Sequence, residues 1–164
     1  MKGNFIFQTK NNKKYKLSKK AAILSDLLKG MIEISEDIEF PIDDSINPET
    51  LEKIIEYLVH FDGNPPKEIS KPLYMTDMKK ITDEYSADFV DKLKIEELVD
   101  MISAAHYMKI NCLLNLCCAK MVSLCKGKSE EEIFDLFGIP KDHFKPEDKK
   151  KIQENNRWID ELFQ

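Results

Sequence analysis

The chain has 164 residues, of which 34% are charged and 42% are hydrophobic, and its formal net charge is −5. This length suits one domain, or one domain with a small extension, and it is long enough to bury a substantial apolar core. The net negative charge repels phosphate backbones, so we do not expect a nucleic-acid-binding protein. Residues 8–16 are polar and leave no room for an apolar signal segment, so we expect an intracellular protein.

The first 42 residues contain strand and helix signals. Aromatic and aliphatic residues in 4–9 and 14–17 flank a polar turn, which predicts a β-hairpin. Ser18 is in position to cap a helix over 19–30, which would end at the glycine there. Alternating apolar residues in 37–42 predict a third strand.

Three helices are predicted in the middle of the chain. Asn47 and the proline after it are start signals for a helix over 49–61. Residues 62–88 are rich in turn-forming residues, and we interpret them as a surface loop. Strongly apolar helices follow over 94–108 and 111–125, with charged and amide side chains that exclude a bilayer span. We therefore expect these two helices to form the core, and we expect no membrane association.

The four cysteines all lie within the apolar helix predicted over 111–125. They are Cys112, Cys117, Cys118 and Cys125. Zinc needs four converging ligands, and the spacing offers no two pairs of cysteines that supply them. We interpret these residues as buried, reduced thiols and expect neither a metal site nor a disulfide framework.

A short helix with clear limits is predicted over 130–137. Ser129 and Glu132 form a capping box before it, and Gly138 is a stop signal after it. On a helical wheel Ile133, Leu136 and Phe137 share one face, while Phe134 points to the side. So short a helix is unstable alone, and its apolar residues need a cover.

The last segment is a polar helix that begins near Pro146. Ile152 is its only bulky apolar residue before Trp158. The tryptophan has two readings of equal weight from its position alone: a lid folded onto the chain's own core, or an anchor against a partner. Helices with more apolar surface than they can hide on one another usually mark an interface.

Catalytic patterns are absent from the sequence. Gly127, Lys128 and Ser129 resemble the end of a phosphate-binding loop, but Val122 stands where that motif requires its first glycine. None of the three histidines has a recognised relation to a nucleophile, and five glycines leave little material for cofactor loops. We therefore expect no enzyme and no cofactor.

The sequence also resembles a known family. The string ISAAHYMKINCLLNLCCAKMVSLCKGKSEEEIFDLFGI over 102–139, and ENNRW over 154–158, are similar to the S-phase kinase-associated protein family, the adaptors of cullin–RING ubiquitin ligases. The string PIDDSINPETLEKIIEYLVHFDGNPP over 41–66 looks like the strand, variable helix and proline-bearing loop of that family. The resemblance extends over essentially the whole chain.

The resemblance implies an α/β (α+β) fold of the BTB/POZ type. Residues 1–111 would form this domain, a small and mainly three-stranded sheet with surrounding helices that faces the cullin. Residues 112–164 would be a C-terminal helical extension that binds F-box proteins. The implied F-box-binding residues are Leu114, Cys118, Ile133, Phe137, Ile139, Ile152, Asn156 and Trp158. The implied cullin-binding residues are Pro41, Ile42, Ile46, His106 and Tyr107.

The implied function is that of a non-catalytic adaptor in the cytoplasm and nucleus, which bridges a cullin scaffold to F-box substrate receptors. The chain departs from the family pattern near the expected cullin contact, at His106, Lys109 and Cys112. The resemblance also allows a homodimer when no partner is bound, since some adaptors of this kind dimerise in that state. The alternative is a BTB/POZ protein that acts as a self-associating or elongin-like scaffold. An enzyme with an unrecognised site is a third, weaker alternative.

Overall fold

The structure of this protein is a computed structural model, and it describes residues 4–9, 14–34, 41–42, 46–140 and 145–162. Side chains are described within these ranges except at 4–9, 34, 41–42 and 158–162. Helices account for most of the described residues. The chain divides into two compact units, Met1–Lys126 and Gly127–Gln164.

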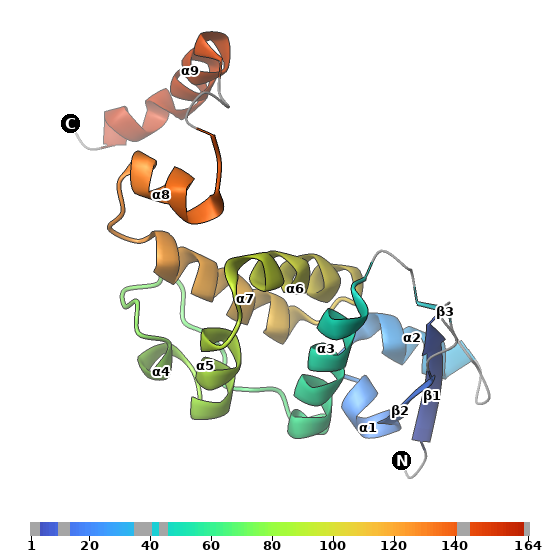
Figure 1. Cartoon of the computed structure of the whole chain (residues 1–164). Helices are drawn as coiled ribbons and strands as arrows, with labels where there is room; N and C mark the ends of the chain where they lie inside the picture. Colours follow the sequence, from blue (N-terminus) through green and yellow to red (C-terminus); the bar gives the residue numbers. More distant parts are fainter. Residues whose placement is uncertain (1–3, 10–13, 35–40, 43–45, 141–144, 163–164) are drawn as a thin grey trace. The chain divides into compact units, whose positions relative to one another are not determined.

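A small sheet lies at the start of the first unit (Figure 1). Its strands, in the spatial order β2-β1-β3, are β1 (Asn4–Thr9), β2 (Lys14–Ser18) and β3 (Pro41–Ile42). Strands β1 and β2 are antiparallel, with Asn4 opposite Ser18, which confirms the predicted hairpin. Strand β3 is parallel to β1 and contributes two residue pairs. The rest of the strand predicted over 37–42 lies outside the described residues.

The single helix predicted over 19–30 is wrong. The structure has two helices there, α1 (Lys19–Ala22) and α2 (Asp26–Ile34). The break is at Ser25, whose hydroxyl donates to the backbone oxygen of Met108 at 2.5 Å and accepts from the backbone N–H of Leu28 at 3.1 Å. Its hydroxyl therefore caps the start of α2, and the glycine at 30 is an interior residue of that helix.

Helix α3 (Pro48–Phe61) forms as predicted. The Asn47 side chain accepts a hydrogen bond from the backbone N–H of Glu49, at 3.0 Å. One face of α3 carries Leu51, Ile54, Tyr57 and Leu58 into the core. The helix ends at Asp62, which has the left-handed backbone conformation.

The surface loop predicted over 62–88 is wrong in its second half. Helix α4 (Met78–Ile81) and the start of helix α5 (Glu84–Asp91) lie there. Asp77 and Asp83 are the N-caps of these helices, because each side chain accepts a hydrogen bond from a backbone N–H. Buried Met78, in α4, anchors this segment to the core.

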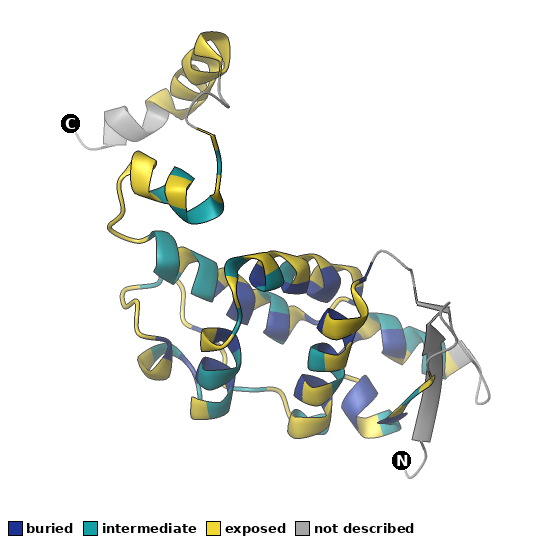
Figure 2. Ribbon diagram, in the orientation of Figure 1, coloured by how far each residue is buried: buried dark blue, intermediate teal, exposed yellow. Residues whose placement is uncertain are grey.

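Helices α6 (Ile95–Tyr107) and α7 (Asn111–Cys125) pack against each other and form the centre of the core, as predicted (Figure 2). Fully or almost fully buried residues along them include Leu98, Met101, Ala105, Leu113 and Leu116. The second unit contains α8 (Glu130–Phe137) and α9 (Pro146–Leu162). No helix in the described ranges has the length and apolarity to cross a bilayer.

Candidate partner-binding surfaces

Helix α8 begins and ends where the sequence predicts. The Ser129 hydroxyl accepts from the backbone N–H of Glu132 at 3.3 Å, and the Glu132 carboxylate accepts from the backbone N–H of Ser129 at 2.8 Å. The hydrogen bond from the Ser129 backbone N–H, with a further contribution from the Ser129 side chain, holds the pKa of the Glu132 carboxyl below its usual value. Gly138 closes the helix in the left-handed conformation, with φ of 62°. The limits of α8 are therefore set by local hydrogen bonds.

The apolar side chains of α8 are not enclosed. Half of its eight residues are bulky and apolar, yet none of the eight is buried (Figure 2). The half-buried residues of this segment are Ile133, Phe134, Leu136, Phe137 and Ile139. Ile133, Phe137 and Ile139 were predicted to bind an F-box, and all three keep accessible surface. An apolar helix face that the rest of the chain leaves uncovered usually marks a surface that binds another protein.

Helix α9 is exposed along the part whose side chains are described. Ile152 is 46% exposed, although it is a large apolar residue. The side-chain amide of Asn156 donates to the backbone oxygen of Ile152, one turn earlier, at 2.8 Å. The side chain of Trp158 lies outside the described residues, so its role as lid or anchor stays a prediction.

The outer face of α7 carries a stripe of accessible apolar residues. Leu114 is half-buried, Cys118 is exposed and Val122 is 48% exposed. These three residues, which we call the α7 stripe, are four positions apart and therefore share one side of the helix. Leu114 and Cys118 are two of the residues that the resemblance assigns to F-box binding. Val122 was missed, although the repeated spacing of four indicates it.

The residues predicted to bind a cullin are partly brought together. Ile46 and Tyr107 line one pocket of about 230 Å³, which we call the α6 pocket. Ile46 is only 8% exposed, whereas Tyr107 is 41% exposed. His106 is exposed but does not line this pocket. Pro41 and Ile42 form β3, and their side chains lie outside the described residues.

The α6 pocket also contains residues that the sequence analysis did not single out. They are Asn47, Asp100, Ser103 and Ala104. The last three lie on α6 at positions 7, 4 and 3 before Tyr107, so they share its face of the helix. That spacing is visible in the sequence, but only the fold shows that α6 presents this face beside Ile46.

The four cysteines are free thiols in the structure. Burial raises the pKa of Cys117 to about 12, and burial also raises the pKa of Cys112. Both thiols are therefore neutral near pH 7 and poorly suited to nucleophilic attack. The prediction that these cysteines are buried holds only for Cys117. Cys112 and Cys125 are half-buried, and Cys118 is exposed on the outer face of α7. In the part of the chain that the structure describes, no three His, Cys, Asp or Glu residues are grouped to hold a metal.

Comparison with known proteins connects these surfaces to one family. A family model described as "Skp1 family, dimerisation domain" matches residues 111–159, from the start of α7 into α9. The S-phase kinase-associated protein 1 homolog of Tetrahymena thermophila is 38% identical over 153 residues, which cover 92% of this chain and 90% of that protein.

Two further relatives are named as subunits of an SCF ubiquitin ligase complex. The E3 ubiquitin ligase complex SCF subunit sconC of Arthroderma benhamiae is 33% identical over 150 residues, which cover 88% of each chain. The SCF ubiquitin ligase complex protein SKP1a of Dictyostelium discoideum is 30% identical over 158 residues, which cover 94% of each chain. With identities of this size along nearly the whole length, the chain belongs to the S-phase kinase-associated protein 1 family.

Proposed function

We propose that this protein is a non-catalytic adaptor subunit of a Skp–cullin–F-box (SCF) ubiquitin ligase, and that it joins a cullin to F-box substrate receptors. The relatives named as SCF subunits support this role. The observation that carries it is the state of α8, which has complete caps at both ends and not one buried residue. Apolar side chains displayed on a defined helix gain most of their burial energy when a second protein covers them.

The F-box receptor is the partner proposed for the C-terminal region, residues 112–164. Helix-in-groove binding uses apolar residues at helical spacing, and α7 and α8 each display such a set. On α7 this set is Leu114, Cys118 and Val122. On α8 and beyond it consists of Ile133, Phe137 and Ile139. On α9 the resemblance assigns Ile152, Asn156 and Trp158 to F-box binding.

The cullin is the partner proposed for residues 1–111, which we assign to the BTB/POZ fold. The small sheet at one side of packed helices supports this assignment. The proposed cullin surface includes the α6 pocket, where exposed Tyr107 stands beside the wall formed by Ile46. His106, Pro41 and Ile42 are assigned to it by resemblance. We also propose that the protein acts in the cytoplasm and nucleus.

A two-sided binding experiment tests the adaptor role. Ile133→Lys places a charge on the open face of α8, so we expect it to abolish capture of a purified F-box domain and to leave cullin capture unchanged. Tyr107→Lys should abolish capture of the cullin and leave capture of the F-box domain unchanged. Asp135→Lys is the matched control, because Asp135 is an exposed residue on the opposite side of α8. Circular dichroism of each variant checks that the helices are intact.

Two outcomes would contradict the proposal. If Ile133→Lys bound the F-box domain as tightly as the unchanged chain, the α8 surface would not be the receptor site. If neither partner were captured by the unchanged, folded chain, the adaptor role itself would be wrong.

Self-association is the second candidate function, and the word "dimerisation" in the description of the matching family favours it. The same open apolar surface would then pair with a second copy of the chain when no receptor is present. Sedimentation over a range of protein concentrations, with and without an F-box domain, separates the two. A dimer that dissociates when the F-box domain is added supports shared use of one surface, whereas a dimer that persists supports the scaffold role.

A further inference from the structure

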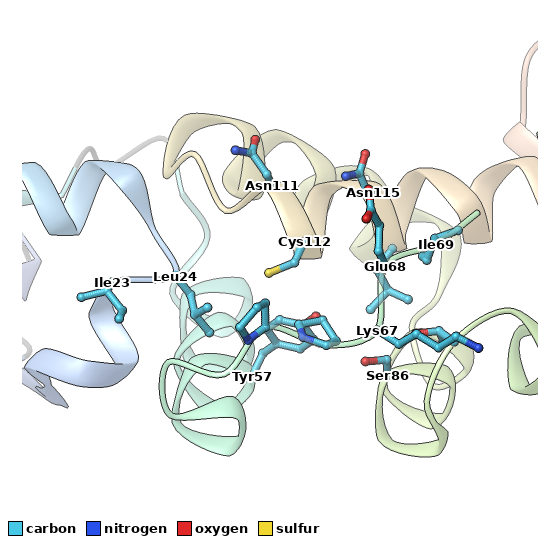
Figure 3. A pocket seen from close by; sticks show the side chains of 14 residues that line it. Ile23, Leu24, Tyr57, Lys67, Glu68, Ile69, Ser86, Asn111, Cys112 and Asn115 are labelled. Carbon is cyan, nitrogen blue, oxygen red and sulfur yellow. The ribbon is translucent and has the colours of Figure 1, made fainter. Parts of the chain in front are cut away.

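A pocket of about 410 Å³ lies in the amino-terminal unit, and none of the residues assigned above to F-box or cullin binding lines it (Figure 3). Its walls come from parts of the chain that are distant in sequence: the turn after α1, helix α3 with the loop that follows it, the region of α4 and α5, and the first half of α7. Pockets for small molecules in proteins usually have volumes of about 300–1,000 Å³.

Most of the wall is apolar and stiff. Ile23 and Leu24 line one side, and Pro65 and Pro66 form part of the loop wall. The loop is held close to α7, because the Lys71 ammonium donates to the side-chain oxygen of Asn115 at 3.2 Å. Proline rings and aliphatic side chains of this kind pack well against a flat apolar or aromatic body.

Two hydroxyl groups in the lining have no hydrogen-bond partner among the described residues. They belong to Tyr57 and Ser86, which are both 0% exposed. The Ser86 hydroxyl and the Cys112 thiol approach the Tyr57 hydroxyl closely enough to shift the pKa of Tyr57, and the Ser86 hydroxyl likewise lowers the pKa of Asp83. None of these side-chain contacts satisfies hydrogen-bond geometry. Figure 3 shows Tyr57 and Ser86 on the lower side of the pocket and Cys112 above them, on α7.

Unpaired hydroxyls are rare inside proteins because each loses its hydrogen bonds to water on burial. Two such groups beside one cavity therefore point to a missing partner that occupies the cavity. A group that accepts hydrogen bonds from both hydroxyls would supply what the fold leaves open.

The interior of the pocket favours an uncharged occupant. Burial raises the pKa of Tyr57 far above its usual value and raises the pKa of Cys112, so both groups stay neutral. The two charged residues of the lining, Lys67 and Glu68, are exposed and belong to the loop. A charged ligand group in contact with the two hydroxyls would lose its hydration without gaining a counter-charge there.

We propose that this pocket binds a small, neutral molecule with an apolar or aromatic body and one carbonyl or amide group, which accepts hydrogen bonds from the hydroxyls of Tyr57 and Ser86. The site is independent of the adaptor function proposed above, since it uses other residues. A bound molecule would touch α3, α5 and α7 together and would stabilise the amino-terminal unit by mass action.

The test is a titration of the full-length, isotope-labelled chain, followed by NMR of its backbone amides. The probes are benzamide, which has the proposed chemistry, benzoate, which has the same shape with a charge, and ethylbenzene, which lacks the acceptor. We expect benzamide to shift the amide signals of Ser86 and Cys112 in a saturable way, and to bind more tightly than either other probe.

Tyr57→Phe removes one hydroxyl and keeps the ring, so it should weaken benzamide binding about fivefold, the value of one neutral hydrogen bond. Ser86→Ala should have a similar effect. Tyr85→Phe is the matched control, because the Tyr85 hydroxyl is also buried without a partner, but Tyr85 does not line the pocket. The Tyr85 variant should bind benzamide as the unchanged chain does.

The proposal is overturned if benzamide gives no saturable shift, which would mean that water alone satisfies the two hydroxyls. It is equally overturned if benzoate binds as well as benzamide, or if Tyr57→Phe and Ser86→Ala both leave the benzamide affinity unchanged.

Discussion

The hydroxyl of Ser25 donates a hydrogen bond to the backbone oxygen of Met108, 83 positions later, at a distance of 2.5 Å. The same hydroxyl oxygen accepts from the backbone N–H of Leu28 and so starts α2. Next to it, the backbone N–H of Asp26 donates to the oxygen of Lys109 at 3.2 Å. One buried serine thus starts a helix and holds it to the end of α6.

Ser25→Ala should therefore lower the free energy of unfolding by about 2 kcal/mol, because it removes a helix cap and leaves a buried carbonyl oxygen unpaired. Urea unfolding followed by circular dichroism measures this. Ser103→Ala is the control, since the Ser103 hydroxyl is exposed and donates only within α6, to Val99. A change of less than about 0.5 kcal/mol is expected there. Equal effects of the two substitutions would contradict a bridging role for Ser25.

Two glycines should respond in opposite directions to alanine. Gly63 has φ of +83°, and a Cβ atom there would stand 2.5 Å from the backbone oxygen of Lys20. Gly63→Ala should lower the free energy of unfolding by about 2 kcal/mol or more. Gly30 lies inside α2 with nothing within 4 Å of such an atom, so Gly30→Ala should raise stability by about 0.5–1 kcal/mol. Thermal unfolding of both variants checks the sign of each change.

The end of α3 is joined to the start of α1 by an acid-sensitive contact. The Asp62 carboxylate accepts from the Ser18 hydroxyl at 2.9 Å and from the Lys20 ammonium at 3.2 Å. These bonds hold the pKa of the Asp62 carboxyl below its usual value of 3.8. A lowered pKa in the folded state means that the stabilisation is present above the unfolded pKa and is lost as pH falls through the folded one.

We therefore expect stability to decline as the pH falls below about 4, with part of the decline due to Asp62. Asp62→Asn removes the charge while keeping a residue that tolerates the left-handed conformation. Stability measured from pH 6 to pH 2 should show a shallower acid decline for this variant. An identical pH profile for the two chains would show that the contact does not contribute.

The α7 stripe offers a test of its missed member. Val122 is 48% exposed on α7, and Val99 is 45% exposed on α6, so the two valines are matched in type and exposure. Val122→Asp should weaken binding of an F-box domain at least tenfold, because it places a charge in a surface proposed to become dry. Val99→Asp should leave the affinity for the F-box domain unchanged. Isothermal titration with each variant measures the difference, and equal affinities would remove Val122 from the proposed surface.

The prediction of the fold from the sequence succeeded where the signals are short-range. The hairpin follows from aromatic and aliphatic residues on both sides of a polar turn, and α8 follows from Ser129, Glu132 and Gly138, whose capping hydrogen bonds join residues within a few positions of each other. The loop predicted over 62–88 failed although its missed N-caps, Asp77 and Asp83, are local signals. The single helix predicted over 19–30 failed because one of its residues contacts a distant part of the chain. No residue near Ser25 in the sequence indicates that its hydroxyl bonds to Met108, so the break between α1 and α2 was not predicted.

The candidate surfaces show the same division. The apolar excess of α8 was readable from residue types, and the α7 stripe was partly readable from their spacing, because a helix imposes its period on any chain that forms one. The pocket beside Tyr57 and Ser86 could not be predicted from the sequence. Its walls come from segments between Ile23 and Leu116, and such distant segments meet only when the whole amino-terminal core is packed. Local hydrogen bonds and helical periodicity involve residues within about one helical turn, so they can be predicted from neighbouring residues. A cavity depends on how distant segments pack, so only the tertiary structure determines it.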